Sequence, residues 1–101
     1  MFTPRYQNEQ TDHLIQSILA LETEEEAYRF LEDLLTIQEM KSITQRLEVA
    51  VMLRNRETYQ EIARKTGAST TTIGRVNRAL QYGADGYTAV LERLLGDEQK
   101  K

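Results

Sequence analysis

The sequence predicts an all-α fold of six helices that includes a helix-turn-helix. Apolar residues recur three and four positions apart in several stretches, as in Phe30, Leu31 and Leu34. No stretch alternates apolar and polar residues with the period of two that a half-buried strand shows. We expect one domain over residues 1–101, with helices over residues 11–21, 24–35, 37–54, 59–65, 70–82 and 86–95.

Capping residues mark where these helices begin and end. In a capping box, a threonine hydroxyl accepts from the third amide of the helix, and a glutamate there reaches back to the amide of the threonine. Three such pairs open the second, third and fourth helices: Thr23 with Glu26, Thr36 with Glu39, and Thr58 with Glu61. Ser69 and Asp85 are expected to cap the next two helices. Glycines end the last three helices, at Gly67, Gly83 and Gly96.

The composition excludes several classes of function. The chain has no cysteine and one histidine, His13, so disulfides, thiolate metal sites and cysteine or histidine catalysis are not expected. No glycine-rich phosphate loop and no catalytic or metal-ligand spacing occurs, so we predict neither an enzyme nor a metal protein. No apolar run approaches the roughly 20 residues of a membrane helix, and the first ten residues lack a signal-peptide core. We therefore expect a cytoplasmic protein without membrane contact.

The net charge of −3 is unevenly distributed along the chain. Residues 1–40 carry two basic and nine acidic side chains, whereas residues 41–82 carry eight basic and three acidic ones. A mildly acidic protein with one basic segment can bind a polyanion through that segment. Charge alone does not exclude the alternative, a solvated charged surface.

The segment from residue 58 to residue 82 has the residue pattern of a helix-turn-helix. Ala63 is small enough for a second helix to cross close to it, and Gly67 supplies the positive φ that the short turn requires. Ile73, Val76 and Leu80 form the apolar stripe of the second helix. The alternative is a helical corner that only packs.

The other face of this second helix suits insertion into the major groove of DNA. We expect the base edges to be contacted by Thr70, Thr71 and Thr72. We expect the phosphates to be contacted by Arg54, Arg56, Tyr59, Gln60, Arg64, Lys65, Arg75 and Arg78. A rival reading is an interaction module that docks on the transcription machinery, whose binding would depend less on salt.

Two stretches, LLTIQEMKSITQRLEVAVML and TYQEIARKTGASTTTIGRVNRALQYG, resemble the Trp-repressor-like family of the YerC/YecD type. The resemblance covers about half of the chain and is most specific in the helix-turn-helix. It implies an intertwined homodimer that binds palindromic double-stranded DNA, and hence a bacterial transcriptional regulator, a repressor, associated with the nucleoid. Side chains expected to lie partly across the dimer interface are Phe30, Leu34, Ile43 and Leu47.

The resemblance also implies a pocket for an effector amino acid. The family residues that hold tryptophan correspond to Thr36, Arg46 and Arg75. Two positions depart from the family pattern, because Val76 replaces a glycine that faces the indole and Ala79 replaces a small hydroxyl residue. We therefore predict that the chain uses no cofactor and does not need tryptophan. A repressor gated by an amino acid remains the alternative.

Overall fold

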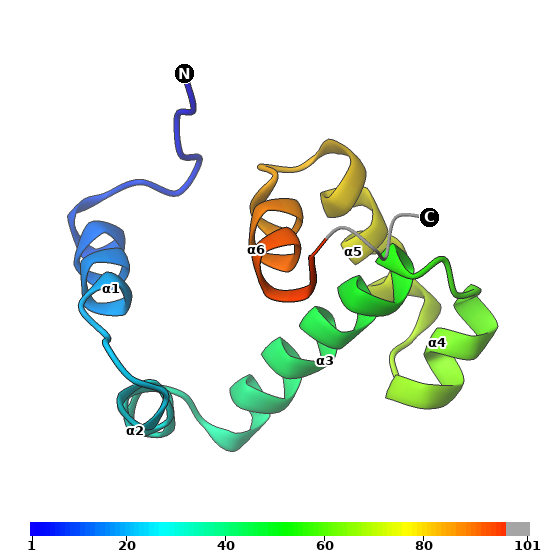
Figure 1. Cartoon of the computed structure of the whole chain (residues 1–101), viewed down its shortest axis with the longest axis horizontal. Coiled ribbons are helices and arrows are strands. Elements are labelled where there is room, and N and C mark those ends of the chain that lie inside the picture. Colours follow the sequence, from blue (N-terminus) through cyan, green and yellow to red (C-terminus); the bar gives the residue numbers. More distant parts are fainter. Residues whose placement is uncertain (97–101) are drawn as a thin grey trace. The chain divides into compact units, whose positions relative to one another are not determined.

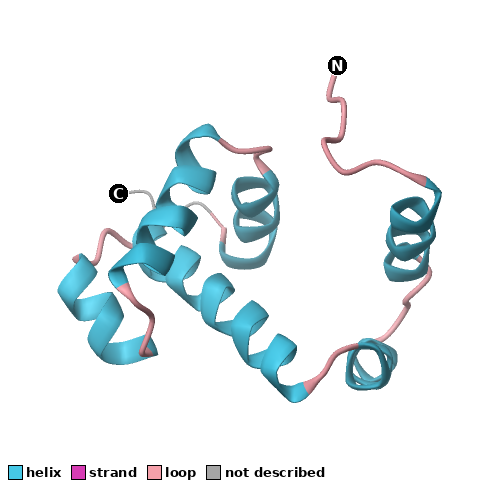
Figure 2. Cartoon of the chain, turned by 180° about the vertical axis from the view of Figure 1, so that it is seen from behind, coloured by secondary structure: helices cyan, strands magenta, loops and turns pink. Residues whose placement is uncertain are grey.

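The structure is a computed structural model that describes residues 1–96, and every regular element in this range is a helix (Figure 2). The helices are α1 (Glu9–Leu19), α2 (Glu24–Leu34), α3 (Ile37–Arg54), α4 (Tyr59–Thr66), α5 (Thr70–Tyr82) and α6 (Gly86–Leu95). The predicted all-α class and all six predicted helices are confirmed. Their ends differ from the predicted ends by at most two residues.

The chain divides after Thr36 into two compact units. The first unit contains α1 and α2, and neither of these helices has a buried residue. The second unit begins at Ile37 and contains α3 to α6.

The second unit has its own apolar core. Figure 1 shows α4 and α5 gathered at the C-terminal end of α3, with α6 alongside. Each helix contributes a side chain with no solvent exposure: Val49 from α3, Ile62 from α4, Ile73 from α5 and Leu91 from α6. Burying a side chain of this kind stabilises a fold by about 1.5–3 kcal/mol. The core thus fixes α4 and α5 on the long helix α3.

The threonine and serine caps form largely as expected. The hydroxyl of Thr23 accepts from the amide of Glu26 at 3.1 Å, and that of Thr58 accepts from the amide of Glu61 at 3.2 Å. The reciprocal bonds differ from the prediction. The Glu26 carboxylate accepts from the amide of Glu22, one residue before the cap, at 2.9 Å, and the Glu61 carboxylate pairs with Arg64 at 2.8 Å.

Two further caps correct the sequence-based expectations. Helix α1 begins two residues early because the Asn8 side chain accepts from the amide of Thr11 at 2.8 Å. Asp85 stands before α6 as expected, but it has a left-handed backbone with φ of 67° and makes no side-chain capping bond. A carboxylate in this backbone conformation does not point at the first amides of the helix, so the prediction of an Asp85 cap was wrong.

Candidate nucleic-acid interface

The turn between α4 and α5 is held by a small network centred on Thr66. Gly67 adopts the left-handed conformation, with φ of 76°, that the sequence required of it. The Thr66 hydroxyl donates to the carbonyl of Ile62 at 2.7 Å and accepts from the amide of Ala68 at 3.1 Å. The Gln45 side chain on α3 donates to the Thr66 carbonyl at 3.1 Å. The long helix therefore anchors the turn directly.

The three threonines predicted to contact bases lie in the first turn of α5. Thr70 and Thr71 are exposed, and Thr72 is half-buried. The Ser69 hydroxyl donates a hydrogen bond to the Thr72 hydroxyl at 3.2 Å. The Ser69 oxygen in turn accepts a hydrogen bond from the Thr72 amide at 3.1 Å. Thr72 thus takes part in the cap of α5, and the outward hydroxyls at this end are those of Thr70 and Thr71.

Among the side chains predicted to contact phosphate, three arginines are exposed and free of ion pairs within residues 1–96. They are Arg56, Arg75 and Arg78. Arg75 and Arg78 lie on α5, one and two helical turns beyond the threonines. Their guanidinium groups can bind two phosphate oxygens at once.

The two cations of α4 are instead paired within their own segment. Arg64 is 2.8 Å from Glu61, and Lys65 is 2.9 Å from Glu57. These carboxylates already neutralise the two cations, and the sequence prediction did not take them into account. The i, i+3 spacing of Glu61 and Arg64 was the available signal.

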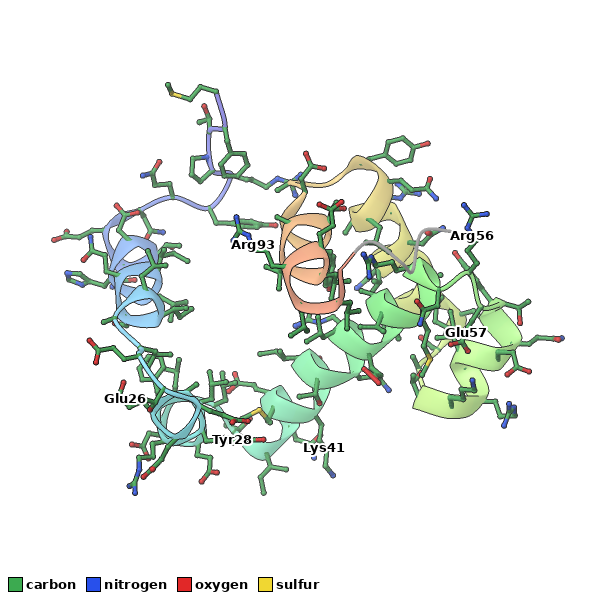
Figure 3. The ribbon with its side chains drawn as sticks, viewed as in Figure 1. Glu26, Tyr28, Lys41, Arg56, Glu57 and Arg93 are labelled. Carbon is green, nitrogen blue, oxygen red and sulfur yellow. The ribbon has the colours of Figure 1, made fainter. Side chains whose placement is uncertain are left out.

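Arg56 closes helix α3 in a backbone conformation that usually requires glycine. Its φ is 65°, its amide donates to the Leu53 carbonyl at 3.0 Å, and the Glu57 amide donates to the Met52 carbonyl at 3.1 Å. This pair of bonds is a Schellman motif. Arg56 and Glu57 lie together on the loop between α3 and α4 (Figure 3), next to the first turn of α4.

Arg54 has a different environment from the other predicted phosphate contacts. It is half-buried, its guanidinium donates to the Gly96 carbonyl after α6, and its Nη1 has no hydrogen-bond partner within the described part of the chain. This arginine joins the end of α3 to the end of α6.

Tyr59 and Gln60 begin α4 and are exposed. The Tyr59 hydroxyl accepts from the Asn77 amide at 3.2 Å, and the Asn77 carbonyl oxygen accepts from Gln81 at 3.3 Å. Asn77 and Gln81 were not among the predicted site residues. Their i, i+4 spacing on one helix was the available signal.

The residues of the implied effector pocket are distributed over both units. Thr36 ends the first unit, whereas Arg46 on α3 and Arg75 on α5 are exposed in the second. Val76 is 3% exposed and belongs to the apolar core, and Ala79 is half-buried. An open hollow of about 520 Å³ lies elsewhere, between α3 and α4, and is lined by Lys41, Thr44, Gln45, Glu48, Lys65 and Thr66.

Residues 1–96 contain neither a membrane-spanning helix nor a metal-binding cluster. None of the six helices is long and apolar enough to cross a bilayer. No group of three or more histidine, cysteine, aspartate or glutamate side chains in this range is arranged to hold a metal ion.

Comparison with known proteins gives consistent results. The family model described as Trp repressor protein matches residues 9–95. The uncharacterized protein YerC of Bacillus subtilis (strain 168) is 51% identical over 90 residues, which cover 89% of this chain and 86% of that protein.

Two solved structures have the same fold. A TrpR-like protein from Eubacterium eligens ATCC 27750 superposes with a TM-score of 0.82 at 56% identity, over 86% of this chain and 90% of that one. A protein from Staphylococcus aureus, provisionally named a Trp repressor, gives a TM-score of 0.84 at 45% identity, over 90% and 91% of the two chains.

Proposed function

Because the chain belongs to the Trp repressor family, we propose that it is a transcriptional repressor that reads double-stranded DNA as a homodimer. The family is one of regulators rather than enzymes. The observation that carries the proposal is the outer face of α5, which combines exposed threonines at its start with unpaired arginines one and two turns later.

Helix α5 has the length and surface of a recognition helix. The major groove is about 12 Å wide and admits one α-helix. With its N-terminal turn directed into the groove, Thr70 and Thr71 face the base edges, where hydroxyls and methyl groups can discriminate among base pairs. Arg75 and Arg78 then meet phosphates on the groove walls and hold the helix in register.

The homodimer is proposed from apolar side chains that this chain leaves uncovered. Exposed aliphatic residues of α1 and α2 are Leu14, Ile15, Ile18, Leu19 and Leu34. Ile43 and Leu47 of α3 are 41% and 39% exposed. Apolar side chains left uncovered on successive helices favour a packing partner. A second copy covers such surfaces and supplies a second recognition helix for the other half of a palindrome.

We further propose that DNA binding needs no effector amino acid. Val76 fills its site within the core, so an indole placed there would have to displace packed side chains. The bond from Gln45 to the Thr66 carbonyl ties the turn between α4 and α5 to α3. The reading head, formed by α4 and α5, is thus held on α3 by the protein's own side chains.

Selection of bound fragments from a random DNA pool tests the proposal. We expect a palindromic consensus whose affinity falls steeply with salt, because phosphate binding releases counterions. Affinity that is independent of sequence and salt, or no DNA binding, would contradict the proposal and favour docking on a protein partner.

A further inference from the structure

A chain of three side chains runs from the recognition helix to the start of α4. Gln81 donates to Asn77 at 3.3 Å, and Asn77 donates to the Tyr59 hydroxyl at 3.2 Å. Asn77 and Tyr59 lie 18 residues apart in the sequence, so this link connects the two helices of the motif. We name Gln81, Asn77 and Tyr59 the amide relay.

The direction of the relay determines where the phenol proton of Tyr59 points. A tyrosine hydroxyl carries one proton and can accept through its oxygen lone pairs. Since the oxygen already accepts from Asn77, its own proton has to point away from Asn77. The Tyr59 side chain is 38% exposed, so the proton is available to a group outside the protein.

The relay also bears on the role of Asn77. An asparagine on the outer face of a recognition helix is normally considered an adenine reader, because its amide can donate and accept at one base edge. Here the nitrogen donates to Tyr59 and the oxygen accepts from Gln81. Both groups that a bidentate base contact needs are therefore engaged inside the protein.

We propose that the Tyr59 hydroxyl donates a hydrogen bond to a DNA phosphate and that Asn77 is a positioning residue that orients this donor. The inference rests on the proposed DNA-binding function. It adds a contact between an uncharged side chain and the DNA backbone, and a residue of the recognition helix orients that side chain. An anionic acceptor is the expected partner because hydrogen bonds to charged groups are about twice as strong as neutral ones. Such a contact is the same at every base sequence.

A double-mutant cycle in the full chain tests this assignment. The variants are Tyr59→Phe, Asn77→Ala and the combination, measured on the selected duplex and on a scrambled one at several salt concentrations. We expect each single change to weaken binding about tenfold on both duplexes. The double variant should be no weaker than either single variant, and the salt slope should stay unchanged because no charge is lost.

Tyr82→Phe is the matched control. Tyr82 also lies on α5 and is 81% exposed, and its hydroxyl makes no hydrogen bond within the described part of the chain. This variant should bind both duplexes like the wild type. Thermal melting should show all variants folded, since neither relay change removes a group of the buried core.

The possible failures are distinguishable. If the wild type binds neither duplex, the proposed function is wrong and the inference with it. The relay does not act as a unit if the wild type binds but the affinity losses of the two single variants multiply in the double variant. The same holds if Asn77→Ala has no effect on affinity. A loss on the selected duplex alone would make Asn77 a base reader. Each of the last three results overturns the inference and leaves the proposed function intact.

Discussion

At the scale of single residues, the basic side chains of the proposed DNA interface differ in whether a carboxylate already pairs with them. Arg75 and Arg78 have no ion pair within the described chain, whereas Arg64 and Lys65 are paired with Glu61 and Glu57. Exposed ion pairs contribute only about 0–1 kcal/mol, so phosphate can replace the carboxylates at a small cost. The residues of one basic segment are therefore expected to contribute unequally to DNA affinity.

Base and phosphate contacts should respond differently to mutation. Arg75→Ala or Arg78→Ala should weaken binding to all sequences and lower the salt slope by about one per protomer. Thr71→Ala should cost about 1–3 kcal/mol on the selected site only, because phosphates are alike at every position and base edges are not. Fluorescence anisotropy on specific and random duplexes separates the two. Equal losses on both duplexes for Thr71→Ala would exclude a base-reading role.

Removing a competing carboxylate should raise DNA affinity. Glu61→Gln releases Arg64 and removes a negative charge from the DNA-facing segment, so we expect binding about two- to fivefold tighter, or about 0.5–1 kcal/mol. The matched control is Glu25→Gln, which breaks the 2.7 Å pair with Arg29 on α2. The control should leave affinity unchanged. Unchanged or weaker binding for Glu61→Gln would show that its pair with Arg64 does not oppose phosphate.

At the scale of helices, capping chemistry made most of the fold predictable. Thr23, Thr58 and Ser69 begin their helices through bonds that depend only on residues up to three positions away. Local patterns of this kind can be read from the sequence. The Asp85 cap failed because the backbone at Asp85 is left-handed. The relay between Tyr59 and Asn77 could not be foreseen because it depends on how α4 packs against α5.

Substitution of Gly74 tests whether α5 enters the DNA groove as a recognition helix. A Cβ added at Gly74 meets nothing within 4 Å, so the fold itself does not require glycine there. Gly74→Ala should raise stability by about 0.5–1 kcal/mol, because glycine inside a helix is unfavourable. It should also weaken DNA binding, since the added methyl stands on the face that we propose approaches the groove.

Gly86 in α6 provides the control for Gly74, because a Cβ there also meets nothing within 4 Å. Gly86→Ala should stabilise the fold and leave DNA affinity unchanged. Thermal melting and anisotropy measure both quantities on the same samples. Affinity retained by Gly74→Ala would mean that DNA does not approach the helix at this point.

At the scale of the whole molecule, the chain holds one well-packed unit and a pair of helices without a core. Within residues 1–96, the seven buried core residues all lie in the second unit, between Val49 and Leu91. Helices α1 and α2 nevertheless carry many apolar side chains. Short isolated helices are marginally stable in water, so these two need packing partners.

We expect the protein to be dimeric at micromolar concentration. The exposed apolar residues of α1, α2 and α3 then become buried, with Phe30, Leu34, Ile43 and Leu47 partly across the interface. Analytical ultracentrifugation measures the mass directly. Leu47→Glu should shift the equilibrium towards monomer, because an unpaired buried charge is costly. A well-folded wild-type monomer at this concentration would contradict the expectation.

Tryptophan should not change DNA affinity. Admitting an indole beside Val76 would overpack the core, at a cost of about 1–3 kcal/mol or one to two orders of magnitude in affinity. Calorimetric titration of tryptophan into the protein, with and without DNA, measures this. Saturable binding below millimolar concentration, or a tenfold gain in DNA affinity, would show that the pocket is open.

The bond between Gln45 and the Thr66 carbonyl has a consequence for the DNA target. It ties the reading head to α3, an 18-residue helix about 27 Å long, so the head cannot pivot freely on that helix. In the proposed dimer, the separation of the two heads is then set by helix geometry. Inserting one base pair between half-sites turns one of them by about 34° about the DNA axis. Operators should therefore tolerate changes in base identity better than changes in half-site spacing.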